Sequence, residues 1–381
     1  MSKLAWGLIG GGEDSQIGRA HRTAAGLDGA FAFTAGALDI DPARGRAFAL
    51  SLGIAEDRAY GTWREMLDRE SKRPDRLDLV TVATPNQTHF EITKAFLEAG
   101  FNVLCEKPMT ATVAEAEEIV AVARETGRLC AVNYGYSGYP LVRQMRAMAT
   151  GGGLGRIRLV VAEFAHGFHA DADDADNPRI RWRYDPDQAG VSSVLADAGS
   201  HALHMACFVT GQRVTRLSAD FASCIEGRAL EDDAQIAFRM NGGAVGRLWT
   251  SAVAVGRVHG LTLQVFGETG GLRWAQEQPN QLLWTPLNET TRVLERGSPN
   301  LSPAAQRASR LVVGHPEGML GAFGNIYGDL AEVVLAGKDG RTPSAEALHY
   351  PSATDGRHSI AIIHAAAASA KADGVWTAVT H

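Results

Sequence analysis

Asp197 and His201 stand four positions apart, where their side chains could act together on one proton. The apolar residues that follow predict a helix over residues 197–210, and positions four apart share one face of a helix. A histidine titrates near neutral pH and can take a hydroxyl proton, while a carboxylate can orient it or accept hydrogen bonds from substrate hydroxyls. Taken singly, Asp197 is better explained as a helix cap and His201 as a buried imidazole.

A second group able to do chemistry is the lysine of Glu106-Lys107-Pro108, which follows an expected buried strand. Thr84-Pro85-Asn86 follows another such strand, and open parallel sheets bind ligands at the carboxyl ends of their strands. An ammonium group there can stabilise an alkoxide or polarise a ketone. Each motif alone is a weak signal, because a lysine at a strand end is more often part of a surface ion pair.

Three consecutive glycines, Gly10 to Gly12, follow the first expected strand and precede a helix. Backbone N–H groups at such a helix start can hold a pyrophosphate, although a tight turn without a ligand would look similar. In the GxGxxG pattern a third glycine would stand at position 15, whereas here it is Gly18, so we expect the loop to bulge. Asp39 ends the second strand about 20 residues after Gly18, as expected for a carboxylate that binds the ribose. This favours NAD over NADP as the cofactor. Arg44 and Arg46 stand nearby in the sequence and leave NADP open as an alternative.

The elements that must position these residues begin with βα units. Short apolar runs alternate with amphipathic stretches in the first third of the chain, a pattern typical of a doubly wound parallel sheet. The expected strands span residues 4–10, 31–38, 77–84, 102–105 and 129–134. Helices are expected over residues 41–53 and 63–73, and a third with a Thr112–Glu115 capping box ends near Gly127.

From residue 156 onward, successive strands joined by turns predict a mostly antiparallel sheet. The expected strands span residues 157–164, 216–223, 234–240, 244–254, 261–266 and 281–284, with turns at 241–243 and 267–271. Helices are expected over residues 321–335 and 359–371. The predicted fold class is α/β: an N-terminal Rossmann sheet over residues 1–135, then an α+β domain with a large open sheet over residues 136–381.

The composition excludes several classes of protein. A chain of 381 residues with 45% hydrophobic and 21% charged residues is typical of a globular protein of two domains. Its net charge of -6 argues against a nucleic-acid partner. Four scattered cysteines argue against a zinc ribbon or a disulfide framework, and we find no export signal or membrane span. We therefore expect a cytoplasmic protein.

Two stretches of the sequence contain side chains that could bind a metal. Asp197, His201 and His204 follow helical spacing for metal ligands, but no further ligand motif accompanies them. The acidic run over residues 171–176 suggests calcium, yet Ala175 stands at a ligand position and no glutamate closes the loop. We expect no metal.

Taken together, the motifs carry a resemblance. The glycine loop, Thr84-Pro85-Asn86 with His89, Glu106-Lys107-Pro108 and the Asp197–His201 stretch, in this order, resemble the glucose-fructose oxidoreductase / inositol dehydrogenase / MocA family. Residues 314–318 and 325–327 resemble a subset of it. The resemblance covers nearly the whole chain. It implies an NAD(P)-binding domain over residues 1–135, and a domain for substrate binding and oligomerisation over residues 136–381.

The resemblance also implies roles for single residues. Lys107 is the expected catalytic lysine, Asp197 the carboxylate that positions the substrate, and His201 the acid/base. Cofactor contacts are expected at Gly10, Gly12, Ser15, Gln16, Ile17, Asp39, Thr84, Pro85, Asn86, His89, Glu106 and Lys107. Substrate contacts are expected at Lys107, Tyr136, His169, Asn177, Trp182, Arg183, Asp197, His201 and His315, because polyols need amides, aromatic rings and charges as partners.

The expected function is therefore NAD(P)-dependent oxidation of a secondary hydroxyl of a sugar, a sugar derivative or an inositol. Its partners would be that small molecule and further copies of the chain, in a homodimer or homotetramer, with no nucleic acid and no membrane. Two alternatives stay open. One is redox-neutral, NAD-assisted glycoside cleavage, and the other is a regulator that senses a dinucleotide or sugar without turning it over.

Overall fold

The computed structural model describes residues 3–172 and 177–380, which form two compact units. Unit 1 contains Met1–Gly138 and Met319–Arg357, and unit 2 contains Tyr139–Gly318 and His358–His381. The chain thus leaves unit 1 close to the expected boundary at residue 135 and later returns to it. That the boundary at residue 135 separates a cofactor-binding domain from a substrate-binding domain stays a prediction.

Unit 1 is built on a sheet of five parallel strands in the order β2-β1-β3-β4-β5. These strands are β1 (Leu4–Gly10), β2 (Phe31–Ala37), β3 (Leu79–Ala83), β4 (Val103–Cys105) and β5 (Cys130–Val132). All five were expected, because strands buried on both faces are continuous apolar runs. The chain order reverses at β1, so the crevice between the carboxyl ends of β1 and β3 is where such sheets bind ligands.

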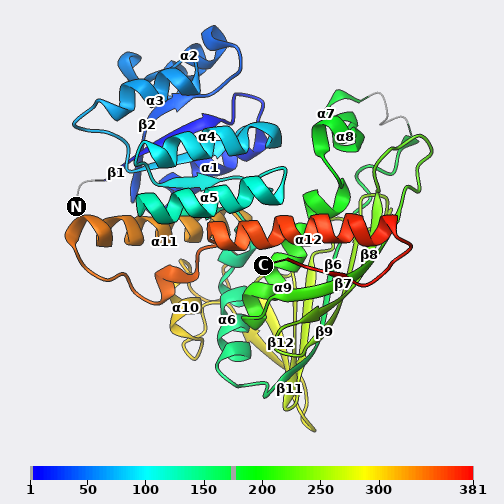
Figure 1. Ribbon diagram of the computed structural model, residues 1–381. Coiled ribbons are helices and arrows are strands. Elements are labelled where there is room, and N and C mark those ends of the chain that lie inside the picture. Colours follow the sequence, from blue (N-terminus) through cyan, green and yellow to red (C-terminus); the bar gives the residue numbers. More distant parts are fainter. Residues whose placement is uncertain (1–2, 173–176, 381) are drawn as a thin grey trace. The chain divides into compact units, whose positions relative to one another are not determined.

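Helices cover both faces of this sheet (Figure 1). They are α1 (Gln16–Gly26), α2 (Pro42–Ser51), α3 (Trp63–Ser71), α4 (His89–Glu98) and α5 (Val113–Thr126). The predicted capping box at the start of α5 is confirmed: the Thr112 hydroxyl accepts from the Glu115 N–H, and the Glu115 carboxylate accepts from the Thr112 N–H. Gly127, at a φ of 65°, ends this helix.

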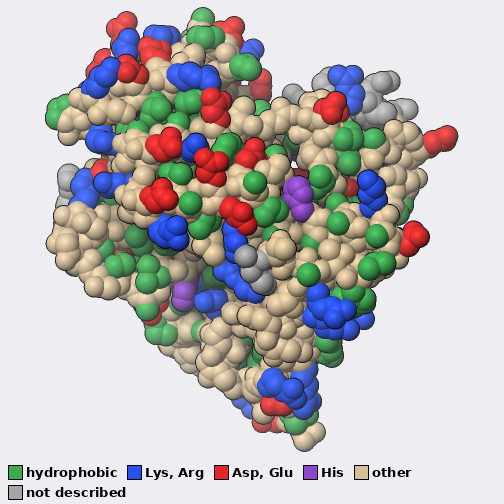
Figure 2. Space-filling view, in the orientation of Figure 1, with side chains coloured by type: hydrophobic (Ala, Val, Ile, Leu, Met, Phe, Trp, Pro, Cys, Tyr) green, Lys and Arg blue, Asp and Glu red, His purple; other side chains and the backbone are tan. Residues whose placement is uncertain are grey.

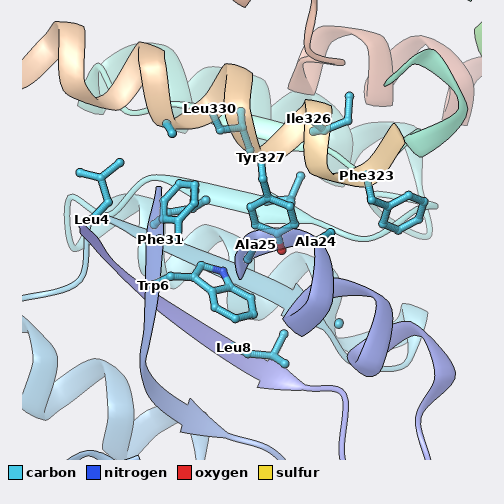
Figure 3. Packing of buried hydrophobic residues seen from close by; sticks show 14 of the residues in the cluster. Leu4, Trp6, Leu8, Ala24, Ala25, Phe31, Phe323, Ile326, Tyr327 and Leu330 are labelled. Atoms are coloured by element: carbon cyan, nitrogen blue, oxygen red, sulfur yellow. The ribbon is translucent and has the colours of Figure 1, made fainter. Parts of the chain in front are cut away.

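A late helix, α11 (Met319–Asp339), completes unit 1. Its residue Tyr327 points between β1 and α1 (Figure 3), and its ring lies edge-on to Trp6 and Phe31 with centroids 5.8 Å from each. These rings belong to one buried apolar cluster that also includes residues of α1. The helix expected over residues 321–335 therefore helps to form the core of unit 1.

Unit 2 is built on a nine-stranded sheet in the order β13-β12-β11-β10-β6-β9-β8-β7-β14. The strands are β6 (Ile157–Ala165), β7 (Val214–Ala222), β8 (Asp233–Met240), β9 (Val245–Ser251), β10 (Thr262–Gly267), β11 (Gly270–Ala275), β12 (Gln281–Pro286), β13 (Arg292–Glu295) and β14 (Thr377–Ala378). Every pairing except β6–β9 is antiparallel, which confirms the predicted fold class. The expected turn at Asn241-Gly242-Gly243 joins β8 to β9.

The longer helices of unit 2 are α6 (Pro140–Thr150) and α9 (Ser200–Thr210), and both pack against the sheet. Three short ones are α7 (Pro178–Arg181), α8 (Pro186–Ala189) and α10 (Pro303–Arg307). The helix α12 (Ala353–Lys371) includes residues of both units. Within the described residues, no helix combines the length and hydropathy that crossing a membrane requires.

Candidate active site

The glycine loop connects β1 to α1 through a backbone that needs glycine. Gly10 and Gly11 have φ angles of 76° and 66°, which side chains disfavour. A Cβ atom on Gly18 would lie 2.2 Å from the Gly11 carbonyl oxygen, so α1 packs directly on the loop. Although Gly18 comes three residues late in the sequence, it therefore allows a close approach of the helix, as the third glycine of the usual pattern does.

The start of α1 and the end of β2 form a cradle that fits a dinucleotide. The Ser15 hydroxyl accepts from the Gly18 N–H and caps α1, and the first N–H groups of the helix, at Gln16 and Ile17, have no partner within it. A Cβ atom on Gly12 would lie 3.3 Å from Asp39 Oδ2, so the Asp39 carboxylate stands beside the loop. The cradle thus combines helix N–H groups, which could bind a phosphate, with a carboxylate, which could accept hydrogen bonds from ribose hydroxyls.

Asp39 makes a two-pronged ion pair with Arg44. Arg44 Nε lies 2.9 Å from Oδ2, and Nη2 lies 2.7 Å from Oδ1. Hydrogen bonds from Arg44 hold the pKa of Asp39 below its usual range, so the carboxylate is charged at neutral pH. Since the side chain of Arg44 is 65% exposed, a ligand could displace it from the carboxylate.

His89 links the two loops that carry the predicted motifs. Its Nε2 lies 2.9 Å from the Thr84 carbonyl oxygen and its Nδ1 lies 2.8 Å from the Pro108 carbonyl oxygen. The ring is fully buried, and burial lowers its pKa although both carbonyls oppose this shift. The structure therefore buries His89 between the loop at Thr84 and the loop at Pro108, and its two contacts hold these loops together.

Lys107 is the accessible residue of a buried segment. From Val103 to Thr110 every side chain is buried except that of Lys107, whose peptide bond to Pro108 is cis. The backbone N–H of Lys107 donates to the Glu106 carboxylate over 3.1 Å. The turn thus presents a single ammonium group at the carboxyl edge of the sheet.

Glu106 itself belongs to a buried polar network that the sequence did not reveal. His21 Nε2 lies 2.9 Å from Glu106 Oε1, and its Nδ1 lies 2.8 Å from the Tyr327 hydroxyl. The Asn133 side-chain amide also donates to Glu106. Although burial opposes it, these partners keep the pKa of Glu106 below its usual range. The network ties the Lys107 turn to α1, α11 and the end of β5, and only the assembled fold brings its members together.

In unit 2, Asp197 and His201 lie in successive turns of one continuous helical segment. Asp197 belongs to a π-helical turn, Leu195–Gly199, which leads directly into α9. From residue 192 to residue 206 every side chain is buried except those of Asp197 and His201. Because helical backbone starts upstream at Val194, Asp197 is not the helix cap. Wide turns of this kind often occur at functional sites.

Glu231 caps this helical segment, and sequence reasoning missed it. Its Oε1 accepts from the Ser192 hydroxyl over 2.6 Å and from the N–H groups of Ser193 and Leu195 over 2.9 and 3.2 Å. Burial raises the pKa of Glu231, and the hydrogen bonds partly offset that rise. Nothing in the chain near Asp197 points to a cap that comes from the residues before β8.

Histidine and aromatic rings gather near His201. The ring centroid of Phe164 lies 6.3 Å from that of His201 and 6.2 Å from that of His166. His169 Nδ1 lies 3.0 Å from the Tyr184 hydroxyl. Burial, assisted by the charge of His169, lowers the pKa of His166 to about 4, so its ring is neutral at pH 7. Such rings can offer both apolar faces and hydrogen bonds to a sugar ring.

The other residues predicted to bind the substrate are spread more widely. Arg183 Nε lies 3.4 Å from Asp197 Oδ2, and its guanidinium group lies over the Trp182 ring. Asn177 stands at the start of α7, where its carbonyl accepts from the N–H groups of Ile180 and Arg181. Tyr136 is buried in unit 1. His315 is exposed in a pocket of about 650 Å³ that Arg296 and Glu317 also line.

The residues weighed as metal ligands form no metal site within the described ranges. No group of three or more His, Cys, Asp or Glu side chains there is arranged to hold an ion. His204 is buried. Of the acidic run, residues 173–176 lie outside the described residues.

Comparison with known proteins decides the family. Residues 4–134 match the model "Oxidoreductase family, NAD-binding Rossmann fold", and residues 142–273 match the "GFO/IDH/MocA C-terminal domain". The chain belongs to the Gfo/Idh/MocA family of oxidoreductases. The resemblance inferred from the motifs is thereby confirmed, as are the oxidoreductase class and the NAD-binding Rossmann domain.

Several relatives match over most of the chain. An inositol dehydrogenase homolog from Azotobacter vinelandii, complexed with NAD+, is 41% identical with a TM-score of 0.93, over 99% of this chain and 97% of that one. A complex of an inositol dehydrogenase homolog from the same organism with NADH and myo-inositol has a TM-score of 0.90, at 41% identity over 99% and 98% of the chains. The uncharacterized oxidoreductase YfiI of Bacillus subtilis is 38% identical over 98% of this chain and 96% of its own length.

Proposed function

We propose that this Gfo/Idh/MocA protein is an NAD-dependent dehydrogenase that oxidises a secondary hydroxyl of a cyclic polyol, either an inositol or a sugar derivative. One observation carries the proposal: along otherwise buried segments, the accessible side chains are Lys107 in unit 1 and Asp197 and His201 in unit 2. These side chains offer a base and a charge-stabilising group of the kinds that alcohol oxidation uses. The binding of myo-inositol by a homolog that is 41% identical supports the substrate class.

In this proposal His201 takes the proton of the substrate hydroxyl, a task that an imidazole can perform as a general base. The Lys107 ammonium stabilises the negative charge that develops on that oxygen. Asp197, beside Arg183, accepts hydrogen bonds from neighbouring hydroxyls and fixes the ring. When bound, NAD would supply the hydride acceptor. The cradle at Gly10, Gly12 and the start of α1 would hold its pyrophosphate.

We further propose that NAD is preferred over NADP. The Asp39 carboxylate is charged and lies beside Gly12, where it can accept hydrogen bonds from ribose hydroxyls and would repel a 2′-phosphate. The ion pair with Arg44 weakens this repulsion, because it neutralises the charge of the Asp39 carboxylate.

Two substitutions test the assignment of the chemistry. Lys107→Met and His201→Asn should each lower kcat by about 10²-fold or more, because each removes a group that acts on the reacting oxygen. NAD binding, followed by protein fluorescence, should stay nearly unchanged in both. Lys94→Met on α4 and His364→Asn on α12 serve as controls, since both lie outside the proposed machinery. Normal turnover in the Lys107 and His201 variants would refute the proposed roles.

A further inference from the structure

A second pocket lies in unit 1, at the edge of the parallel sheet opposite the glycine loop. It encloses about 1010 Å³. Its lining includes Ala5 in β1 and three residues that stand directly before strands: Asp78 before β3, Asn102 before β4 and Leu129 before β5. A strand of seven residues is about 23 Å long, so the length of β1 separates this pocket from Gly10. The pocket is therefore distinct from the dinucleotide cradle.

The pocket carries an excess of positive charge. Its lining includes Lys3, Arg76, Arg128 and Lys338, but only two carboxylates. Both carboxylates are engaged: Asp78 pairs with Lys338 over 2.5 Å, and Asp75 pairs with Arg73 and Arg58. Across the described part of the chain, Arg76 and Arg128 have no carboxylate within ion-pair distance. Figure 2 shows basic side chains on unit 1 near the start of the chain.

Arg76 is held in place for a ligand. Its Nη2 donates to the Ala99 carbonyl oxygen over 2.8 Å, and its guanidinium carbon lies 3.8 Å from the centre of the buried Phe101 ring. These contacts occupy one N–H group and one face of the guanidinium group. Its position is thus fixed before any ligand arrives, which reduces the entropy lost on binding.

The second guanidinium group, that of Arg128, lies next to Gly100, as that of Arg76 does. A Cβ atom on Gly100 would lie 3.8 Å from both Arg76 Nη2 and Arg128 Nε, so these two atoms are less than about 8 Å apart. Burial and the charge of Arg128 lower the pKa of Arg76. Two like charges at this separation repel each other, and an anion bound by both would relieve the repulsion.

We propose that this pocket is a binding site for a phosphate group, held between Arg76 and Arg128. Guanidinium groups donate paired hydrogen bonds that match phosphate oxygens, and a phosphate carries enough charge to neutralise two arginines. The phosphate can be the free ion or part of a small phosphate ester. This site is independent of the proposed dehydrogenase activity.

Calorimetric titration of the NAD-saturated full chain with inorganic phosphate tests the site, since NAD then occupies the other edge of the sheet. Saturable binding is expected. Arg128→Gln should weaken it at least tenfold and should fold normally, because Arg128 is exposed. Arg124→Gln is the matched control: Arg124 is exposed four residues earlier on the same segment and does not line the pocket, so phosphate affinity should not change.

Two further titrations complete the test. Sodium chloride at equal ionic strength should give no saturable heat. A phosphate monoester such as glycerol phosphate distinguishes the two sources: tighter binding than that of inorganic phosphate identifies an ester as the ligand, and weaker binding identifies the free ion. The proposal is overturned if inorganic phosphate and the monoester both fail to bind the wild-type chain saturably, or if Arg128→Gln binds as the wild type does.

Discussion

At the scale of single residues, burial sets the protonation state of His166. The ring packs among Phe164, Phe168 and His259, and its pKa is lowered to about 4. At pH 7 it is therefore a neutral side chain that can donate one hydrogen bond and accept another. Such a ring adds polarity to its surroundings in unit 2 without adding a charge.

This low pKa predicts how stability depends on pH. An unfolded histidine titrates near pH 6.5, so between about pH 6.5 and 4 the unfolded chain binds the proton that folded His166 excludes. The stability contribution is fully present above about pH 6.5 and is lost as the pH falls toward 4. In His166→Gln, the melting temperature should therefore fall less between pH 7 and pH 5 than in the wild type. His315→Gln, at an exposed site, should behave like the wild type. Equal losses in the His166 variant and the wild type would contradict the assignment.

At the scale of elements, the contact between α1 and the glycine loop positions the cradle that we propose for the cofactor. Gly18 and Gly26 lie on the same helix but in different surroundings. A Cβ atom on Gly18 would lie 2.2 Å from a backbone oxygen of Gly11, whereas one on Gly26 would meet nothing within 4 Å. The two positions therefore form a matched pair for testing whether this contact matters.

Gly18→Ala should lower the free energy of unfolding in urea by about 3 kcal/mol or more, because backbone cannot move aside as a side chain can. The affinity for NAD should fall as well. Gly26→Ala should raise stability by up to about 1 kcal/mol, since alanine favours helix, and leave NAD affinity unchanged. If both variants bound NAD equally well, the contact would have no part in forming the cradle.

Some of these elements could be predicted from the sequence, and others could not. The five parallel strands were predictable because each is a buried apolar run, and Thr112 with Glu115 marked the start of α5. β11 was missed because it begins with Gly270-Gly271, which is typical of a turn, and β13 because it is short and mostly exposed. The π-helical turn at Asp197 and its cap Glu231 were not predictable, since they depend on a contact between distant segments.

At the scale of the whole molecule, the open face of the nine-stranded sheet is the surface that we propose for oligomerisation. Leu159 on β6 and Phe266 on β10 stand directly opposite each other, and they are 47% and 36% exposed. Exposed apolar sheet faces invite association. The Gfo/Idh/MocA resemblance of the sequence implied that the domain over residues 136–381 takes part in oligomerisation.

Light scattering tests this interface. The wild type should have a mass near two or four times the chain mass of 40.6 kDa. Leu159→Lys should shift it toward 40.6 kDa because an ammonium group would be buried in the contact. Leu27→Lys, at a leucine that is 45% exposed in unit 1, should keep the wild-type mass. A monomeric wild type would refute the proposal. An unchanged mass for Leu159→Lys would show that the interface does not include Leu159.

The central claim is that a hydride passes from a polyol carbon to NAD. The most direct measurement uses a panel of inositols and sugars deuterated at their carbinol carbons, incubated with the protein and NAD, with mass spectrometry of the nicotinamide. For at least one compound we predict that reduced nicotinamide accumulates with one transferred deuterium, in equal amount to the ketone or lactone formed. Product formation without net deuterated reduced nicotinamide would show redox-neutral chemistry. No turnover across the panel would contradict the account altogether.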